Sequence, residues 1–149
     1  MAEGFFLFPG QGAQAVGMAK DAYDAGGHAV ALFDEASEIL GFDLAAMTFA
    51  GDEATLALTE NCQPALLVAS LAMLDTLQET RTVTLRGGAG LSLGEYTALV
   101  ALEAMDFSDA VRLVRRRGEL MAAAGCASTG YSSGGGSGSG ASPCPCSGK

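Results

Sequence analysis

Residues 90–94 read Gly-Leu-Ser-Leu-Gly, a G-x-S-x-G motif in which the serine could act as a nucleophile. The glycines permit a sharp turn that lifts the Ser92 hydroxyl out of the path of the chain, provided that a strand precedes the motif and a helix follows it. The first N–H groups of that helix would stabilise negative charge on a carbonyl oxygen attacked by Ser92. The same residues also fit a structural turn in which Ser92 caps the helix and Glu95 completes a capping box. The motif therefore predicts acyl-transfer chemistry and leaves a structural alternative open.

Arg117 is a second residue that could do chemistry, because its place on a predicted helix conflicts with its charge. At about 100° per residue, it falls inside the apolar stripe formed by Ala110, Leu113, Val114, Gly118 and Met121. The opposite, polar face holds Arg112, Arg115, Arg116 and Glu119. A guanidinium on an apolar face must meet an anion, since an unpaired buried charge is very costly, and its planar fork suits a carboxylate. That carboxylate could belong to an internal ion pair or to a substrate, and the residues alone leave both open.

Two strands and several helices are predicted to position these residues. Residues 4–8 form a short apolar run that ends at Pro9, which is typical of a strand buried in a parallel sheet. A second strand is predicted over 82–85, before the glycines that lead to Ser92. Helical periodicity covers about 15–25, 29–40, 52–59, 63–79, 93–104 and 108–124, with Gly41 and Ser108 as expected caps. This alternation predicts an α/β fold with a parallel sheet, although two strands are too few to complete one.

The chain of 149 residues divides into two compositions. Residues 1–124 have the apolar content of one globular domain, and the segment 63–79 is apolar almost all round, so we expect this helix at the centre of the core. Residues 125–149 are rich in glycine and serine and are expected to be disordered, either as a flexible linker or as sequence without selected structure. Cys144 and Cys146 in this tail are too close together for the usual metal-binding spacing, so no metal site is expected.

Charge and hydropathy narrow the range of partners. The net charge is −9, and Lys20 is the one basic residue in the first 80, which argues against binding to nucleic acid. No apolar run approaches the roughly 20 residues of a membrane span, and the N-terminus lacks the basic region of a signal peptide. We therefore expect a cytoplasmic, enzyme-like protein that binds neither nucleic acid nor membrane.

Four segments that include these residues together resemble the malonyl-CoA:acyl-carrier-protein transacylases of fatty-acid and polyketide synthesis. They read Phe-Pro-Gly-Gln-Gly-Ala-Gln at 8–14, Asn-Cys-Gln-Pro-Ala-Leu at 61–66, Gly-Leu-Ser-Leu-Gly-Glu-Tyr at 90–96 and Val-Arg-Arg-Arg-Gly-Glu-Leu-Met at 114–121. The segments occur in that family's order and at about its spacing, and the resemblance spans about residues 4–124. It implies part of an α/β-hydrolase-like acyltransferase core, without the family's small ferredoxin-like subdomain.

The resemblance also implies a reaction and a role for each site residue. Ser92 would take malonyl from malonyl-CoA as a serine ester and pass it to the phosphopantetheine thiol of acyl carrier protein. Gln11 and the backbone N–H of Leu93 would form the oxyanion hole. Arg117 would bind the free carboxylate of the malonyl group. No metal or prosthetic group is implied, and malonyl-CoA enters as a substrate.

The sequence departs from the family pattern in ways that bear on activity. Family members are about twice as long, and their general-base histidine and a further glutamine lie in the second half. The single histidine here, His28, lies at a predicted helix start and is expected to be a solvated surface residue. Leu91 replaces the histidine that usually precedes the nucleophile. Because a serine without its base is a poor nucleophile, this chain alone is expected to be weakly active or inactive.

Two other functions are compatible with parts of the sequence. The G-x-S-x-G motif alone would fit a serine esterase of the α/β-hydrolase type, although Arg117 and the loop that carries Gln11 argue against it. A chain with too few strands and no base would also fit a non-catalytic remnant of an enzyme. A response to malonyl-CoA and a cooperative unfolding transition would separate these functions.

Overall fold

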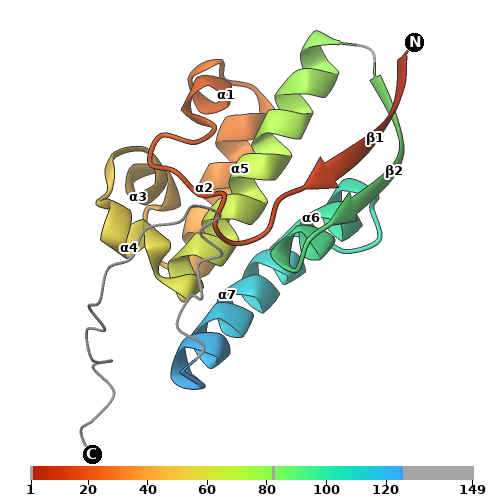
Figure 1. Ribbon diagram of the computed structural model, residues 1–149. Coiled ribbons are helices and arrows are strands. Elements are labelled where there is room, and N and C mark those ends of the chain that lie inside the picture. The colour runs from red at the N-terminus through yellow and green to blue at the C-terminus, as the bar shows by residue number, and fades with distance from the viewer. Residues whose placement is uncertain (1, 82, 126–149) are drawn as a thin grey trace, which may run out of the picture.

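The computed structural model describes residues 2–81 and 83–125, in which helices pack on one side of a small sheet (Figure 1). In chain order the elements are β1 (Ala2–Phe8), α1 (Lys20–Asp24), α2 (His28–Leu40), α3 (Leu44–Ala50), α4 (Glu53–Ala57), α5 (Thr59–Thr80), β2 (Val83–Gly90), α6 (Leu93–Ala101) and α7 (Phe107–Ala123). The predicted α/β class is confirmed. None of the helices within this part of the chain is long and apolar enough to cross a membrane. Disorder is predicted for residues 125–149. Residues 126–149 of this segment lie outside the described residues.

β1 and β2 pair in parallel, as predicted, and make a two-stranded sheet within the described residues. The register places Phe8 opposite Gly90, so the two strands end at the same edge of the sheet. The loop that follows β1 and the motif that follows β2 therefore lie next to each other. This pairing brings the predicted Gln11 loop and the predicted nucleophile to the same edge of the sheet.

The two faces of the sheet have different surroundings because side chains alternate along a strand. Phe8 is buried on the inner face, where it packs with Ala98 of α6 and with the partly buried Phe6. Phe5 and Leu7 turn to the outer face and remain largely exposed. The sheet thus forms one border of the molecule, with the helices on its inner side (Figure 1).

α5 lies at the centre of the core, as its apolar composition predicts. It packs against both α2 and α7, and Leu67 and Val68 on it are fully buried. The helix continues through Pro64, which has no N–H to donate to the carbonyl of Glu60. α7 approaches α5 at this same turn, because a Cβ at Gly118 would lie 2.6 Å from the Cα of Glu60.

The first half of the chain differs from the prediction in two places. The helix predicted over 15–25 is only α1, because the residues before it form turns in which Gly17 and Ala19 have positive φ values of 88° and 59°. The second difference is α3, which the prediction omits. It begins at Leu44, and its N-cap is Asp43, whose side chain accepts a hydrogen bond from the Ala46 N–H at 2.7 Å. In contrast, the predicted cap at Gly41 is confirmed, since this residue ends α2 with φ of 76°.

Other element boundaries also differ from the predicted ones. β2 runs to Gly90 rather than ending at 85, because its glycine-rich half continues the pairing with β1 and leaves room for the Phe5 ring over Gly87. α4 spans only part of the predicted 52–59, and α6 ends three residues before the predicted 104. α7 begins at Phe107 with Asp106 in the N-cap position, so the predicted cap at Ser108 is wrong.

Candidate active site

Ser92 lies at the turn between β2 and α6, in the strand–turn–helix context that a nucleophile elbow requires. Its φ of 55° and ψ of −101° are backbone angles that residues with a side chain rarely adopt, and such a conformation costs about 1–3 kcal/mol. Neither flanking glycine has room for a side chain: a Cβ on Gly90 would overlap the Gly94 carbonyl group, and one on Gly94 would overlap the carbonyl oxygen of Phe8. Ser92 makes no side-chain cap to α6, so the capping-box alternative is wrong.

The end of β1 contacts this turn. The Leu91 N–H donates to the Phe8 carbonyl oxygen at 3.2 Å, which extends the pairing of the strands by one residue. Gly10 lies so close that a Cβ on it would be 2.6 Å from the carbonyl oxygen of Leu91. Since Gln11 follows Gly10, the predicted loop does reach the nucleophile turn. Leu91 itself is 74% exposed.

The two groups predicted for the oxyanion hole belong to the two segments that meet where Gly10 approaches Leu91. Leu93 is the first residue of α6, and no described residue accepts the hydrogen of its backbone N–H. The side-chain amide of Gln11 donates one hydrogen to the hydroxyl of Thr59 at 3.1 Å, which leaves its second amide hydrogen for another acceptor. A free N–H at a helix start beside the nucleophile is suited to stabilising an oxyanion. The two roles remain predictions.

Arg117 reaches from α7 to the nucleophile. Its Nη2 donates to the Ser92 Oγ at 2.8 Å, and its Nη1 donates to the side-chain oxygen of Gln63 at 2.7 Å. The guanidinium carbon also lies 5.7 Å from the centre of the Tyr96 ring. None of the ion pairs formed within residues 2–81 and 83–125 includes Arg117. The guanidinium thus points at the reactive oxygen, and the described part of the chain gives it no carboxylate partner.

Gln63 is a site residue that was not predicted from the sequence. It lies on α5, is fully buried, and accepts the hydrogen bond from Arg117 while its amide nitrogen donates to the sulfur of Met121 at 3.3 Å. A buried amide with both ends engaged holds the guanidinium in one orientation. The signal that could have found it is a glutamine within a helix that is otherwise apolar almost all round.

The helical wheel describes α7 only in part. Val114 and Gly118 are buried as predicted, but Leu113 is exposed, and Arg117 lies half-buried at the nucleophile rather than in the core. Arg115, expected on the polar face, has a side chain that is only 29% exposed. The reason is that the buried arc of α7 also includes Val111, one turn before Arg115, so that the contact with α5 is wider than the apolar stripe.

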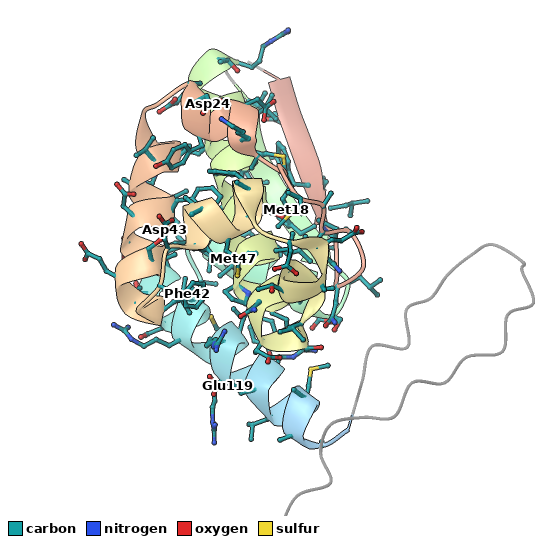
Figure 2. The ribbon with its side chains drawn as sticks, turned by 90° about the vertical axis from the view of Figure 1, so that its left-hand side faces the viewer. Met18, Asp24, Phe42, Asp43, Met47 and Glu119 are labelled. Atoms are coloured by element: carbon teal, nitrogen blue, oxygen red, sulfur yellow. The ribbon has the colours of Figure 1, made fainter. Side chains whose placement is uncertain are left out.

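Arg115 compensates for the proline in α5. Its Nη1 donates to the carbonyl oxygen of Glu60 at 3.1 Å and to the side-chain oxygen of Asn61 at 2.8 Å. The Glu60 carbonyl is the one that Pro64 deprives of its helical donor, so the guanidinium replaces the missing N–H. Its guanidinium carbon also lies 5.6 Å from the ring centre of Phe42, which faces the viewer with Glu119 in Figure 2. Arg115 therefore fixes the turn of α5 that carries Gln63.

Replacing Arg115 with methionine should lower the free energy of unfolding by about 1–3 kcal/mol, because the Glu60 carbonyl then loses the donor that stands in for the helical N–H. A urea titration followed by circular dichroism measures this loss. In a Pro64→Ala background the restored N–H should reduce the cost of Arg115→Met, whereas an equal cost in both backgrounds would contradict the assignment. Arg112→Met is the matched control on the exposed face of α7 and should change stability by less than about 0.5 kcal/mol.

The other groups with possible chemistry lie outside this arrangement. Burial raises the pKa of the Cys62 thiol to about 11, so it stays protonated near neutral pH and is a poor nucleophile. His28 begins α2 with a largely exposed side chain, as predicted, and its Nδ1 lies 3.2 Å from a carboxylate oxygen of Asp75. Within the described ranges, no group of three or more histidine, cysteine or carboxylate side chains could hold a metal ion.

A groove of about 420 Å³ adjoins the guanidinium of Arg117 between α6 and α7. Its lining is mostly apolar and consists of Tyr96, Leu113, Arg116, Arg117, Leu120, Met121 and Ala124. A larger hollow of about 740 Å³ lies among α1, α2 and α3, where Phe42 and Asp43 are labelled in Figure 2. The larger hollow contains none of the predicted site residues, so the groove beside Arg117 is the better candidate for a substrate.

A serine on a strained strand-to-helix turn, a free N–H after it and a guanidinium on its oxygen are the parts of a serine-dependent acyl-transfer site. Comparison with known proteins agrees with this class. Residues 5–131 match the model of the acyl transferase domain family, and the chain belongs to this family.

Three similar proteins share one activity in their names. The malonyl CoA-acyl carrier protein transacylase of Bacillus subtilis (strain 168) is 50% identical over 125 residues, which are 84% of this chain and 39% of the relative. The crystal structure of the Clostridium perfringens transacylase of the same name has 40% identity and a TM-score of 0.75, covering 81% of this chain and 38% of that one. A malonyl-transacylase solved in complex with a type II PKS acyl-carrier protein has 44% identity and a TM-score of 0.76, covering 83% and 40%. The chain spans about two fifths of the length of the curated relatives it matches.

Proposed function

We propose that this chain carries the nucleophile and the acyl-binding group of a malonyl transferase, which moves malonyl from coenzyme A to the phosphopantetheine thiol of acyl carrier protein. The relatives named above are malonyl transacylases, and one of them was solved with an acyl-carrier protein bound. The observation that carries the proposal is the hydrogen bond from Arg117 to the Ser92 Oγ, together with the missing carboxylate partner of Arg117 among the described residues.

In the proposed first step, the Ser92 oxygen attacks the thioester carbonyl carbon of malonyl-CoA. The tetrahedral oxyanion accepts hydrogen bonds from the Leu93 N–H and from Gln11, and it collapses with cleavage of the carbon–sulfur bond. The serine proton passes to a base from solution, such as imidazole, and the thiolate leaves and is protonated to the thiol of coenzyme A. In the second step the phosphopantetheine thiol attacks the serine ester and restores the Ser92 hydroxyl. We propose no metal or prosthetic group for either step.

Arg117 selects the acyl group in this scheme. A guanidinium has five N–H donors, and among the described residues Ser92 and Gln63 each accept a hydrogen bond from one of its nitrogens. The remaining donors can bind the free carboxylate of a malonyl group whose thioester carbon lies at Ser92. An acetyl group offers no anion to this site, so it gains nothing from the guanidinium. A serine esterase for neutral esters has no use for a cation at its nucleophile, and this argues against that alternative.

Incubation with malonyl-CoA should add one malonyl group to the chain, and intact-mass spectrometry should detect it. The Ser92→Ala variant should lose the modification completely, because it lacks the attacking oxygen. The single histidine of the sequence, His28, contacts Asp75 and makes no hydrogen bond to Ser92. Ser92 therefore has no histidine base among the described residues, so acylation should be slow, about a thousandfold or more below that of a serine with its histidine base. Added imidazole should therefore accelerate it.

Acetyl-CoA is the matched substrate control and should give far less acyl-protein than malonyl-CoA under the same conditions. Modification that persists in Ser92→Ala, or equal modification by the two thioesters, would contradict the proposal. The absence of modification even with imidazole would favour the non-catalytic alternative.

A further inference from the structure

The hydroxyl of Thr59 binds Gln11, the side chain proposed for the oxyanion hole. Thr59 is the first residue of α5 and is only 7% exposed. Its Oγ1 accepts a hydrogen bond from the amide nitrogen of Gln11 at 3.1 Å. The two residues are 48 positions apart in the chain, so the contact exists only because the loop after β1 packs on the start of α5. A buried hydroxyl in this place can orient a group of the candidate site.

Backbone contacts hold both partners of this hydrogen bond. The loop that carries Gln11 is closed by the Ala13 N–H, which donates to the Gly10 carbonyl oxygen at 3.4 Å, and Gly10 itself packs against the nucleophile turn. On the other side, α7 packs on the start of α5, since a Cβ at Gly118 would lie 2.7 Å from the Thr59 carbonyl oxygen. The hydrogen bond thus joins two segments that are already fixed, which lets it set the orientation of the amide.

The same face of α5 holds a second orienting side chain. Gln63 lies four residues after Thr59, so the two are neighbours on one face of the helix. Gln63 binds Arg117, whereas Thr59 binds Gln11. The first turns of α5 therefore orient the group proposed to bind the malonyl carboxylate and, separately, the group proposed to bind the oxyanion. Only the second of these groups is needed by every acyl substrate.

We infer that Thr59 is a positioning residue for acyl transfer: by accepting one amide hydrogen of Gln11, it turns the second toward the oxyanion that forms when Ser92 attacks. Because this role rests on the proposed function, its effect is on the rate of that reaction. Loss of an oxyanion-hole donor slows acyl transfer about a hundredfold to a thousandfold, so a Gln11 that is present without its orienting partner should cost less, about tenfold to a hundredfold.

The test is the rate of Ser92 acylation in Thr59→Val, which keeps the branched shape and lacks the hydroxyl. Acylation by malonyl-CoA and by acetyl-CoA, each with imidazole, should slow by about tenfold to a hundredfold, and the ratio of the two rates should not change. Thr59→Ser retains the hydroxyl and should restore most of the rate. In a Gln11→Ala background, Thr59→Val should cause no further loss, because it acts through Gln11.

Thr76→Val is the matched control, the same change on α5 at a hydroxyl that donates to the Ala72 carbonyl oxygen, and it should leave the rates unchanged. A urea titration followed by circular dichroism should show that Thr59→Val is folded under the assay conditions. An unchanged rate in Thr59→Val, an equal loss in Thr59→Ser, or a loss that adds to that of Gln11→Ala would overturn the inference.

p-Nitrophenyl acetate separates the role of Thr59 from the malonyl proposal, because this activated ester carries no carboxylate. Ser92 attacks its carbonyl carbon, the serine proton passes to a base from solution, and the ester carbon–oxygen bond breaks to release p-nitrophenolate. Intact-mass spectrometry counts the acetyl group after subtraction of the Ser92→Ala background. If the ester acylates Ser92 and malonyl-CoA does not, the malonyl proposal fails, and Thr59→Val should still slow the ester reaction. An ester reaction of equal rate in Thr59→Val would overturn the role of Thr59 alone, and the absence of Ser92-dependent acylation by all three reagents would overturn both.

Discussion

Replacing Gly90 with alanine is expected to lower the free energy of unfolding by about 3–5 kcal/mol, a loss that few single substitutions reach. The reason is backbone overlap: a Cβ at this position would occupy the space of the Gly94 carbonyl group. Neither backbone segment can shift at a low energetic cost, because Gly90 is paired with Phe8 in the sheet and Gly94 lies in the first turn of α6. A urea titration followed by circular dichroism would measure the change in midpoint and slope.

Gly88→Ala is the matched control, two residues earlier on the same strand. A Cβ on Gly88 would meet its nearest atoms at ordinary distances, 3.4 Å from a ring carbon of Phe8 and 3.6 Å from the Cβ of Ala98. We expect its cost to be no more than about 1 kcal/mol. Equal losses for Gly88→Ala and Gly90→Ala would mean that β2 is sensitive to any side chain and that the turn has no special requirement for glycine.

The turn at Ser92 could be predicted from sequence because its requirements are local. Glycines at 90 and 94 permit the sharp turn between them, and a β-branched run before the motif and helical periodicity after it supply the context. The same holds for α5, whose apolar composition leaves a central position as the only favourable one, and for the end of α2 at Gly41.

The parts that the sequence did not predict depend on contacts between distant residues. Arg115 is counted as a surface residue on a helical wheel, and only the packing of α7 on the turn that contains Pro64 gives it a buried carbonyl to bind. The second half of β2 is nearly all glycine, and its strand conformation comes from pairing with β1 rather than from β propensity. α3 is short and lacks a clear apolar period, so its start after the N-cap Asp43 is recognised only from the hydrogen bond of that cap.

The candidate site likewise combines residues that local sequence predicts with contacts that only the packed structure shows. The sequence indicates Ser92, Leu93 and Arg117 by motif, helix position and conflict of charge with surroundings. It does not indicate that Arg117 donates a hydrogen bond to Ser92. The direction of the guanidinium is set by the buried Gln63, which lies on a third element, α5. A pairing across three elements is a property of the packed structure, and no spacing along the chain encodes it.

Replacing Arg117 with methionine should reduce acylation by malonyl-CoA by about a hundredfold to a thousandfold, measured as the rate of malonyl addition by intact mass. Two charge-assisted hydrogen bonds to a carboxylate are worth about 3–4 kcal/mol in total, and methionine supplies none of them. Methionine has a similar length and keeps the contact with Tyr96, so the variant isolates the loss of charge and donors. Acylation by acetyl-CoA should not fall, because acetyl makes no use of the guanidinium and the Ser92 oxygen is released from its hydrogen bond.

The ratio of the two acylation rates is therefore the decisive quantity, since a damaged nucleophile would slow both thioesters alike. Arg112→Met is the matched control on the exposed face of α7: its guanidinium lies beside Asp109 and does not line the groove at Arg117, so the ratio should stay that of the unmodified chain. Gln63→Leu should give an intermediate loss, because Arg117 would keep its charge but lose the partner that orients it. If Arg117→Met slows malonyl and acetyl transfer equally, Arg117 acts only through the position of Ser92, and selection of the dicarboxyl group must come from elsewhere.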